Sequence, residues 1–180
     1  MMKEFKPLDS NVEVLGEATL SIVNSFPEFM RGIAMDMLEK NGISNPQPGH
    51  WYKQSDLMDC LSEIDQEFGG NTLFEIGKAV PENAQFPPGI TNLFDALEVI
   101  NTAYQMNHRN GEIGFYKVVE RNDAENTIVM QCRNPYPCDF DRGVITAISR
   151  KFHPGIKVTL DDTKPARKKG AEESWYIITY

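Results

Sequence analysis

The sequence has few basic residues: 18 lysines and arginines face 26 aspartates and glutamates, which gives a formal net charge of −8 at pH 7. Nucleic acids and anionic membrane surfaces attract basic protein surfaces, because both present phosphate charge. The charge balance therefore predicts that the chain binds neither of them. One short basic run, Arg167–Lys169, is interpreted as a solvated loop or as a minor contact site for an acidic partner.

Cysteine is scarce as well. Cys60, Cys132 and Cys138 are an odd number, and no two of them form a C-x-x-C pair. We therefore expect reduced thiols and a cytoplasmic protein. The three cysteines and the three histidines lack the spacing of zinc ligands, so the sequence predicts no metal site.

Long apolar runs are absent too. No stretch approaches the roughly 20 apolar residues that a bilayer-spanning helix requires. Near Met1 there is no charged segment followed by an apolar run, as there would be in a signal peptide. The expectation is a chain with no membrane span and no signal peptide.

What the sequence does contain is typical of one globular domain. Its 180 residues, of which 41% are hydrophobic, suffice to bury a core. We expect a single domain over residues 1–180, mainly helical over 1–110 and β-rich over 111–180. Apolar residues recur every three to four positions in the first part, as on one face of an α-helix. The expected helices are Ala18–Phe26, Pro27–Lys40, one capped by Ser55 and ending at Gly69, Leu73–Val80, and one capped by Thr91 or Asn92 and ending near Tyr104.

The period changes after residue 110. Side chains alternate over Ile113–Val119 and Thr127–Arg133, with a polar turn between them, which predicts a hairpin. A helix over Phe140–Phe152 and two strands, Ile156–Asp161 and Ser174–Tyr180, follow. The order β-β-α-β-β after a run of helices predicts an α+β fold, in which N-terminal helices pack on a four-stranded antiparallel sheet.

Four short motifs, in this order, resemble those of one superfamily of ligand-binding domains. They are Gly114–Tyr116, the Asn-Pro-Tyr-Pro-Cys run Asn134–Cys138, Phe140–Gly143, and Arg167–Ala171 before the last strand. From about Leu15 onward the chain resembles haem-nitric-oxide-binding (H-NOX) proteins, 4-vinyl-reductase domains and subunits of TRAPP tethering complexes. The run that ends at Gly143 is the most specific and indicates a bacterial or archaeal subfamily. The resemblance implies a ligand cavity between helices and sheet.

Two departures limit what the resemblance implies. Similar vinyl-reductase-type sequences carry cysteines near the C-terminus, where this chain has Pro165, Ala166 and Ser174. A metal or redox site built on such thiols is therefore not expected. H-NOX proteins hold haem with a helical histidine and a Tyr-x-Ser-x-Arg motif, whereas here Tyr104 and Arg109 are five positions apart with no matching serine. The resemblance leaves haem open as a cofactor, but no matching motif supports it.

His108, Arg109 and Glu112 follow the last of the expected N-terminal helices. A helix C-terminus favours cations, and Glu112 could pair with either of them. One interpretation is a charge network that fixes this corner. The other is a clamp for an anion at the wall of a pocket, since a guanidinium binds a carboxylate through two hydrogen bonds. The candidate ligand-binding residues are Trp51, Tyr104, His108, Arg109, Glu112 and Tyr116. Core packing is the alternative for each aromatic ring.

The Asn-Pro-Tyr-Pro-Cys run is interpreted as a stiff corner, because its two prolines fix φ as the chain enters the next helix. Asn134 and Tyr136 belong to this corner, and Asp141 falls near the first helical turn, where a carboxylate could cap free N–H groups. The alternative is a reactive thiol. A helix N-terminus lowers the pKa of a thiol such as Cys138, although the adjacent Asp139 opposes this.

We expect a non-catalytic sensory or regulatory domain that binds a small apolar or carboxylated ligand. The alternatives are an assembly module that forms a homodimer through an apolar helical face, and a haem-based gas sensor. That face would comprise Phe29, Met30, Met35 and Met37. An enzyme is the least favoured class, because the sequence has no visible pairing of acid with base or of nucleophile with base.

Overall fold

The computed structural model describes residues 4–180. Its main sheet has four antiparallel strands in the order β4-β5-β7-β6. The strands are β4 (Phe115–Asn122), β5 (Thr127–Arg133), β6 (Lys157–Leu160) and β7 (Ser174–Thr179), and α6 (Cys138–Arg150) lies between β5 and β6 in the chain. The predicted β-β-α-β-β order and the α+β class are therefore confirmed.

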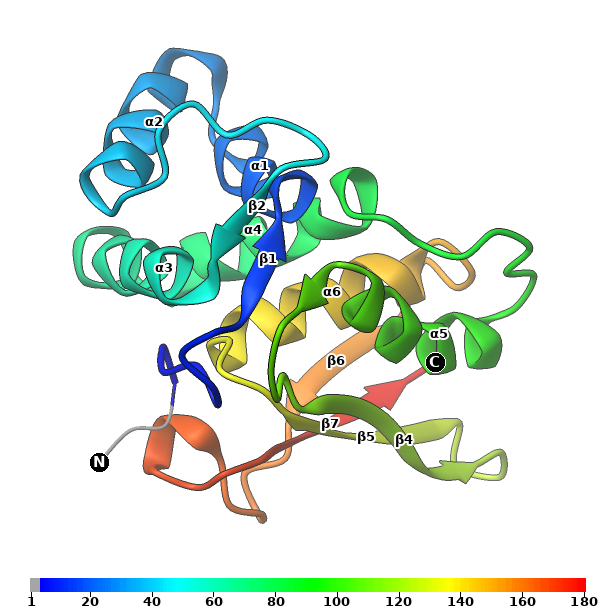
Figure 1. The fold of residues 1–180 in the computed structure, drawn as a ribbon. Helices are drawn as coiled ribbons and strands as arrows, with labels where there is room; N and C mark the ends of the chain where they lie inside the picture. Colours follow the sequence, from blue (N-terminus) through cyan, green and yellow to red (C-terminus); the bar gives the residue numbers. More distant parts are fainter. Residues whose placement is uncertain (1–3) are drawn as a thin grey trace.

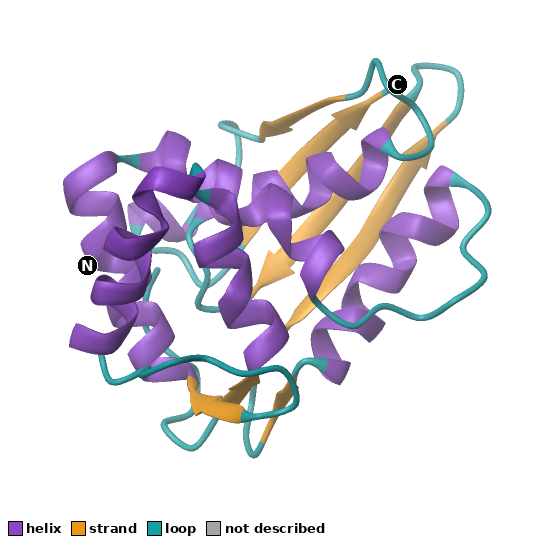
Figure 2. Cartoon of the chain, turned by 90° about the horizontal axis from the view of Figure 1, so that it is seen from above, coloured by secondary structure: helices purple, strands orange, loops and turns teal. Residues whose placement is uncertain are grey.

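Helices cover one face of this sheet (Figures 1 and 2). Alternate residues of β5, from Ile128 to Cys132, are buried, while the residues between them are half-buried, as expected for a sheet with one covered face. Within the described residues, five α-helices precede the main sheet, with a 3₁₀ turn, η1 (Glu28–Met30), between the first two. They are α1 (Gly16–Ser25), α2 (Arg31–Lys40), α3 (Gln54–Phe68), α4 (Gly70–Asn83) and α5 (Leu93–Met106). Within residues 4–180, no helix combines the length and the apolar character needed to cross a membrane.

Helices α4 and α6 cross with their backbones in contact at two glycines. A Cβ atom on Gly77 would lie 2.1 Å from the carbonyl oxygen of Phe140, and one on Gly143 would lie 2.2 Å from that of Phe74. Because any side chain would collide with backbone here, both positions require glycine. The crossing fixes α4 against α6, and both helices contribute to the cavity described below.

The predicted helix caps are half right. Asn92 caps α5 as predicted, since its Oδ1 accepts from the backbone N–H of Asp95 at 3.0 Å. The predicted cap of α3 is wrong: the helix begins at Gln54, Lys53 occupies the cap position, and its side chain makes no capping bond. Ser55 therefore lies one position inside the helix. The predicted cap, a small polar residue just before the apolar stripe, thus lies two positions after the observed cap position.

Helix boundaries also differ from the prediction, most of all at two helices. The helix predicted over Leu73–Val80 runs from Gly70 to Asn83, and Pro81, which has no N–H to donate, lies in its last turn. The helix predicted over Pro27–Lys40 begins only at Arg31, after the 3₁₀ turn η1. Both differences concern the ends of helices, where the apolar period carries the least information.

A second, three-stranded sheet is not predicted by the sequence. It consists of β1 (Glu13–Leu15), β2 (Trp51–Lys53) and β3 (His108–Arg109) in the order β2-β1-β3. Strands of two or three residues are too short to show an alternating pattern. This sheet places Trp51 and His108 in strands on either side of β1, a pairing that the sequence does not predict.

Candidate functional site

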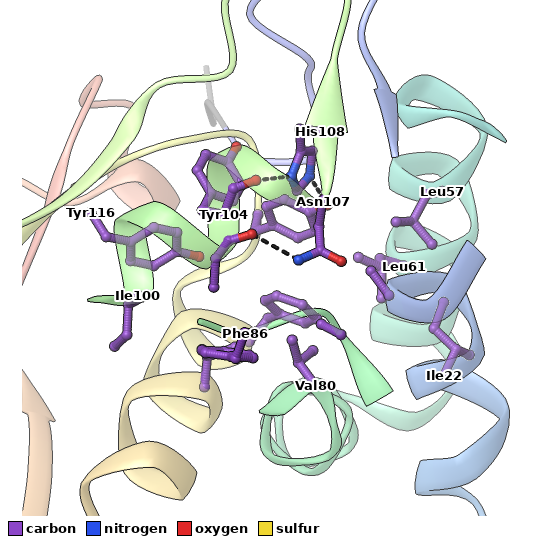
Figure 3. A pocket seen from close by; sticks show the side chains of 16 residues that line it. Ile22, Leu57, Leu61, Val80, Phe86, Ile100, Tyr104, Asn107, His108 and Tyr116 are labelled. Carbon is purple, nitrogen blue, oxygen red and sulfur yellow. Dashed lines mark hydrogen bonds between the residues drawn. The ribbon is translucent and has the colours of Figure 1, made fainter. Parts of the chain in front are cut away.

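A cavity of about 50 Å³ lies between α5 and α6, which contact the main sheet, and the helices α1, α3 and α4. Figure 3 shows Ile22 of α1 and Leu61 of α3 on one side of this cavity and Ile100 of α5 on the other. Most of the walls are aliphatic or aromatic. They include Ile22, Leu57, Leu61, Ile100, Phe140 and Val144.

His108 forms the polar edge of the cavity and is 8% exposed. Its Nδ1 lies 2.8 Å from the carbonyl oxygen of Tyr104, and its Nε2 lies 2.7 Å from the hydroxyl of Tyr136. A carbonyl only accepts, so Nδ1 carries the proton and Nε2 accepts from the tyrosine. Burial lowers the pKa of His108 to about 4, against the smaller opposing effect of the hydrogen bond to Tyr104. The imidazole is therefore neutral at physiological pH.

Asn107 holds another wall of the cavity in place. Its Nδ2 donates to the carbonyl oxygens of Gln85 (2.9 Å) and Ala103 (2.7 Å), and its Oδ1 accepts from the N–H of Gln85 (3.2 Å). These bonds tie the connection between α4 and α5 to the end of α5. Phe86, the next residue of that connection, contributes to the cavity wall. The side-chain amide of Asn107 thus keeps this connection over the cavity.

Tyr104 and Tyr116 line the cavity, while their hydroxyl groups bond to the surrounding protein. Tyr104 donates to the carbonyl oxygen of Ile113 (2.7 Å), and Tyr116 donates to Asp141 (2.5 Å). Burial raises the pKa of both hydroxyls, so both keep their protons at physiological pH. The hydroxyl proton of each tyrosine is therefore already donated to a protein acceptor.

The structure does not bring His108, Arg109 and Glu112 together, as both the charge network and the anion clamp would require. His108 and Arg109 are successive residues of β3, so their side chains point to opposite sides, and the first is buried while the second is exposed. Glu112 pairs with Arg133 instead of with either of them. Of the three, only the neutral His108 reaches the cavity.

Trp51 lies on the small sheet and does not line the cavity. The guanidinium of Arg109 stacks over its ring at 4.3 Å, and Nε of Arg109 donates to Glu13 at 2.6 Å. The pairing of β1 with β2 and β3 brings these side chains together. Of the candidate ligand-binding residues, the structure thus gathers Tyr104, His108 and Tyr116 at the cavity, and it adds Tyr136 from the corner before α6.

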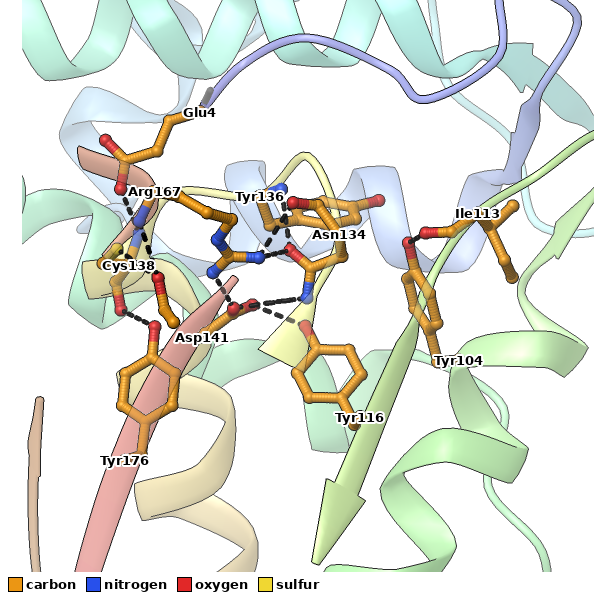
Figure 4. Close-up of polar contacts among 11 residues, drawn as sticks. Glu4, Tyr104, Ile113, Tyr116, Asn134, Tyr136, Cys138, Asp141, Arg167 and Tyr176 are labelled. Carbon is orange, nitrogen blue, oxygen red and sulfur yellow. Dashed lines mark hydrogen bonds and ion pairs between the residues drawn. The ribbon is translucent and has the colours of Figure 1, made fainter. Parts of the chain in front are cut away.

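That corner is held by a buried salt bridge between Arg167 and Asp141, whose side chains are 1% and 0% exposed. Arg167 also donates through Nη1 to the backbone carbonyl (2.8 Å) and the side-chain oxygen of Asn134. Asp141 accepts in addition from Tyr116 and from Nδ2 of Asn134 at 3.2 Å (Figure 4). Burial raises the pKa of Asp141, and Arg167 and the hydrogen-bond donors oppose this shift. Four side chains from distant parts of the chain thus form one network.

Asp141 lies in the first turn of α6 as predicted, but it does not cap the helix, because its carboxylate belongs to this network. Glu4 supplies the cap instead, since its Oε1 accepts from the backbone N–H of Cys138 at 2.6 Å. The predicted stiff corner agrees with a further bond, in which Oδ1 of Asn134 accepts from the N–H of Tyr136 at 2.9 Å. A carboxylate 134 positions away leaves no local signal in the sequence.

The solvated-loop interpretation is also wrong for Arg167, although Lys168 and Lys169 are exposed. By composition the three basic residues look alike. One cue for Arg167 was available, since the run Arg167–Ala171 is among the motifs that carry the family resemblance. Nothing in the run itself distinguishes a buried arginine from two exposed lysines.

Cys138 is buried at this corner, as Cys60 and Cys132 are elsewhere. Its Sγ lies 3.1 Å from the hydroxyl of Ser174. Burial raises the pKa of Cys138, and the charge of Glu4 raises it further, so the geometry does not support a reactive thiolate. Among the residues that the structure describes, no three His, Cys, Asp or Glu side chains are grouped so as to hold a metal ion.

No protein-family model and no curated protein matches the chain. Solved structures do match it. One, from a study of haem distortion in the H-NOX family, has a TM-score of 0.64 at 14% identity and covers 92% of this chain and 94% of its own. A mutant H-NOX protein from S. oneidensis in the Fe(II) state has a TM-score of 0.62 at 13% identity, with 88% and 94% covered. An oxygen-binding H-NOX domain related to soluble guanylate cyclases has a TM-score of 0.62 at 14% identity, with 91% and 93% covered.

At such low identities these matches show that the fold is shared. The H-NOX part of the family resemblance is therefore confirmed at the level of the fold. Its 4-vinyl-reductase and TRAPP parts stay predictions.

Proposed function

We propose that this chain is a non-catalytic sensory or regulatory domain that binds a small molecule in the cavity beside His108. The observation that carries the proposal is a largely apolar cavity with one polar edge, formed where helices meet in an H-NOX-like fold. Apolar pockets with a few placed polar groups are the usual form of small-molecule sites. Cys138, the thiol that the sequence offers as reactive, bonds to Ser174, and His108 bonds to Tyr136, so the two do not form a thiol–imidazole pair.

The size of the cavity limits the ligand. An engineered cavity of about 150 Å³ binds benzene or xenon, and this cavity holds about 50 Å³. A ligand that enters without rearrangement therefore has only a few non-hydrogen atoms. A larger ligand would have to move the connection between α4 and α5, which Asn107 holds over the cavity.

One of the similar structures comes from a study of haem distortion, so the fit of haem to this chain has to be tested. A neutral histidine such as His108 suits a metal ion, but both of its ring nitrogens already bond to protein atoms. Pockets for larger ligands hold about 300–1,000 Å³, far more than this cavity. The residues as arranged do not fit haem, and we derive no function through it. We expect reconstitution with haem to give no Soret band in the absorption spectrum.

A homodimeric assembly module is a second candidate, because an apolar side chain stands out on the surface. Phe29 is 86% exposed and Ile33 is 44% exposed. The face differs from the predicted one: Met37 is buried in the core, and Met30 and Met35 are half-buried. Light scattering tests this candidate. A dimer in the wild type that Phe29→Glu converts to a monomer would support it, and a monomer at millimolar concentration would oppose it.

Xenon provides a test of the cavity itself. We expect xenon under pressure to shift the NMR signals of methyl groups that line it, such as those of Ile22, Leu61 and Ile100. Ala84→Val should abolish these shifts, since Ala84 lines the cavity and its extended backbone (φ −70°, ψ 157°) accepts a β-branched residue. Ala124→Val, in the exposed turn between β4 and β5, is the control and should behave as the wild type. Wild-type methyl signals that ignore xenon would refute the proposed site.

A further inference from the structure

The wall of the cavity faces solvent mainly on one side. All of the residues that line it are buried except four: Ala18, Val80, Ala84 and Phe86. Ala18 lies on α1, which packs against α4, and Val80 lies in the last turn of α4. Ala84 and Phe86 belong to the connection, residues 84–92, that leads from α4 to α5 (Figure 3). The shortest way between solvent and the cavity therefore passes the end of α4 and this connection.

Few hydrogen bonds hold the connection in place. Most of the remaining wall consists of helices and strands, whose backbone groups bond to one another. The other irregular part of the wall is fixed, because Tyr136 donates through its hydroxyl to His108 and through its N–H to Asn134. By contrast, residues 86–91 make no hydrogen bond to any described residue, and none of them is buried. Segments with few bonds and little burial open at the lowest free energy. The connection is therefore the part of the wall that moves most easily.

Asn107 holds the near end of the connection. Its amide donates to the carbonyl oxygen of Gln85 at 2.9 Å and accepts from the N–H of the same residue at 3.2 Å. The side chain of Gln85 adds a longer contact of 3.4 Å to Glu17 of α1. The far end of the connection is Asn92, which caps α5. Between these two ends the connection depends on packing alone.

The segment beyond Gln85 is stiff. Pro87 and Pro88 each fix φ, and Gly89 has φ +85°, a conformation that is strained for a residue with a side chain. A stiff segment moves as a unit. Release at Gln85 would therefore carry the ring of Phe86 away from the cavity.

We propose that the connection between α4 and α5 is the gate of the cavity, with the amide of Asn107 as its latch and Phe86 as the side chain that moves aside. The inference rests on the proposed function and concerns access to the same site. A ligand enters and leaves during brief openings and is bound by the closed form. A change that weakens the closed gate therefore speeds up association and dissociation by the same factor and leaves the affinity unchanged.

Gly89→Ala tests the gate without touching the cavity. The added carbon has no heavy atom within 4 Å, but the positive φ strains the closed connection. Gly69→Ala is the matched control, because Gly69 has φ +78° and equally open surroundings but lies at the junction of α3 and α4. Xenon is the probe, and NMR of the cavity methyl groups gives its rates. We expect both rates to rise about tenfold together in Gly89→Ala with no change in affinity, and neither to change in Gly69→Ala.

Asn107→Leu and hydrogen exchange test the latch itself. The substitution removes the amide and keeps a side chain of similar size, so both xenon rates should again rise by about tenfold. The N–H of Gln85 reports each opening directly, since its acceptor is Asn107. In heavy water we expect it to exchange faster than the buried amides of α5 in the wild type, and about tenfold faster still in Gly89→Ala.

The other outcomes separate this inference from the proposed function. Unchanged xenon rates in Gly89→Ala would overturn the inference and leave the function standing, and so would an N–H of Gln85 that exchanges only together with the core of α5. If Asn107→Leu does not fold, Gly89→Ala decides alone. If xenon leaves the methyl signals of the wild type unchanged, the proposed function itself fails, and the gate has no site to serve.

Discussion

Phe140 and Asp141 are neighbours on α6 but belong to two different interiors. Phe140 lines the cavity, whose walls are held mostly by apolar contact. Asp141 sits in the network with Arg167, Asn134 and Tyr116, where nearly every polar atom has a directed partner. A network of buried charges tolerates one arrangement, because any displacement leaves a charge unpaired. Apolar walls impose no such condition. The corner therefore fixes the fold, whereas the cavity beside it can accept a small ligand.

The substitution Arg167→Met tests this contrast with the largest expected effect on stability. The substitution leaves the Asp141 carboxylate buried without its cation. Breaking a buried pair in this way typically costs about 3–5 kcal/mol. We expect a loss of that size in the free energy of unfolding, measured by urea denaturation at pH 7.

The double variant Arg167→Met/Asp141→Leu is the control, since it removes both charges and keeps apolar volume. It should recover much of the loss, because replacing a whole buried ion pair by apolar residues is often nearly neutral. A loss below about 1 kcal/mol in the single variant would contradict the prediction. The corner would then be no more constrained than the cavity.

The sequence predicts the difference between the corner and the cavity only in part, because some of the residues involved are marked by local patterns and others are not. The main sheet and α6 follow from alternation and the helical period, which are local signals. The corner was located through its prolines, but its partners Arg167 and Glu4 come from the two ends of the chain and carry no local mark. At the cavity, the sequence predicts Tyr104, His108 and Tyr116 as polar or aromatic residues near one turn. Asn107 was missed, because an asparagine at the end of a helix looks like any solvated residue until its burial is known.

The pH dependence of the free energy of unfolding tests the comparison at the cavity, through His108. His108 has a pKa of about 4 when folded and a usual value of 6.5 when unfolded. Between these values the unfolded chain binds the extra proton, so stability is lost as the pH falls through this window and is fully present above pH 6.5. The contribution amounts to about 3 kcal/mol between pH 7 and pH 4, at about 1.36 kcal/mol per unit of pKa. Tyr104 and Tyr136 stay protonated throughout, because burial raises the pKa of both.

His108→Gln isolates this effect, since an amide can keep a donor and an acceptor but does not titrate. Urea denaturation of both proteins between pH 4 and pH 7 should give a steeper loss of stability on acidification for the wild type than for the variant. The difference between the two curves is the contribution of His108. Parallel curves would show that His108 takes up its proton without unfolding, and that the edge of the cavity is open to water.

The glycine crossing of α4 and α6 gives the smallest expected effect and the most local test. It joins α4, which contains Val80, to α6, which contributes to both the cavity and the buried network. Gly77→Ala places a methyl group against the backbone of Phe140, and overpacking of this kind costs about 1–3 kcal/mol. Gly32→Ala is the matched control: Gly32 lies in α2 with no heavy atom within 4 Å of the added carbon, so the helix should gain about 0.5–1 kcal/mol. Thermal or urea unfolding of both variants checks the opposite signs. Equal stability of the two would mean that α4 separates from α6 without cost, and that the small cavity reflects a soft contact between helices instead of a fixed wall.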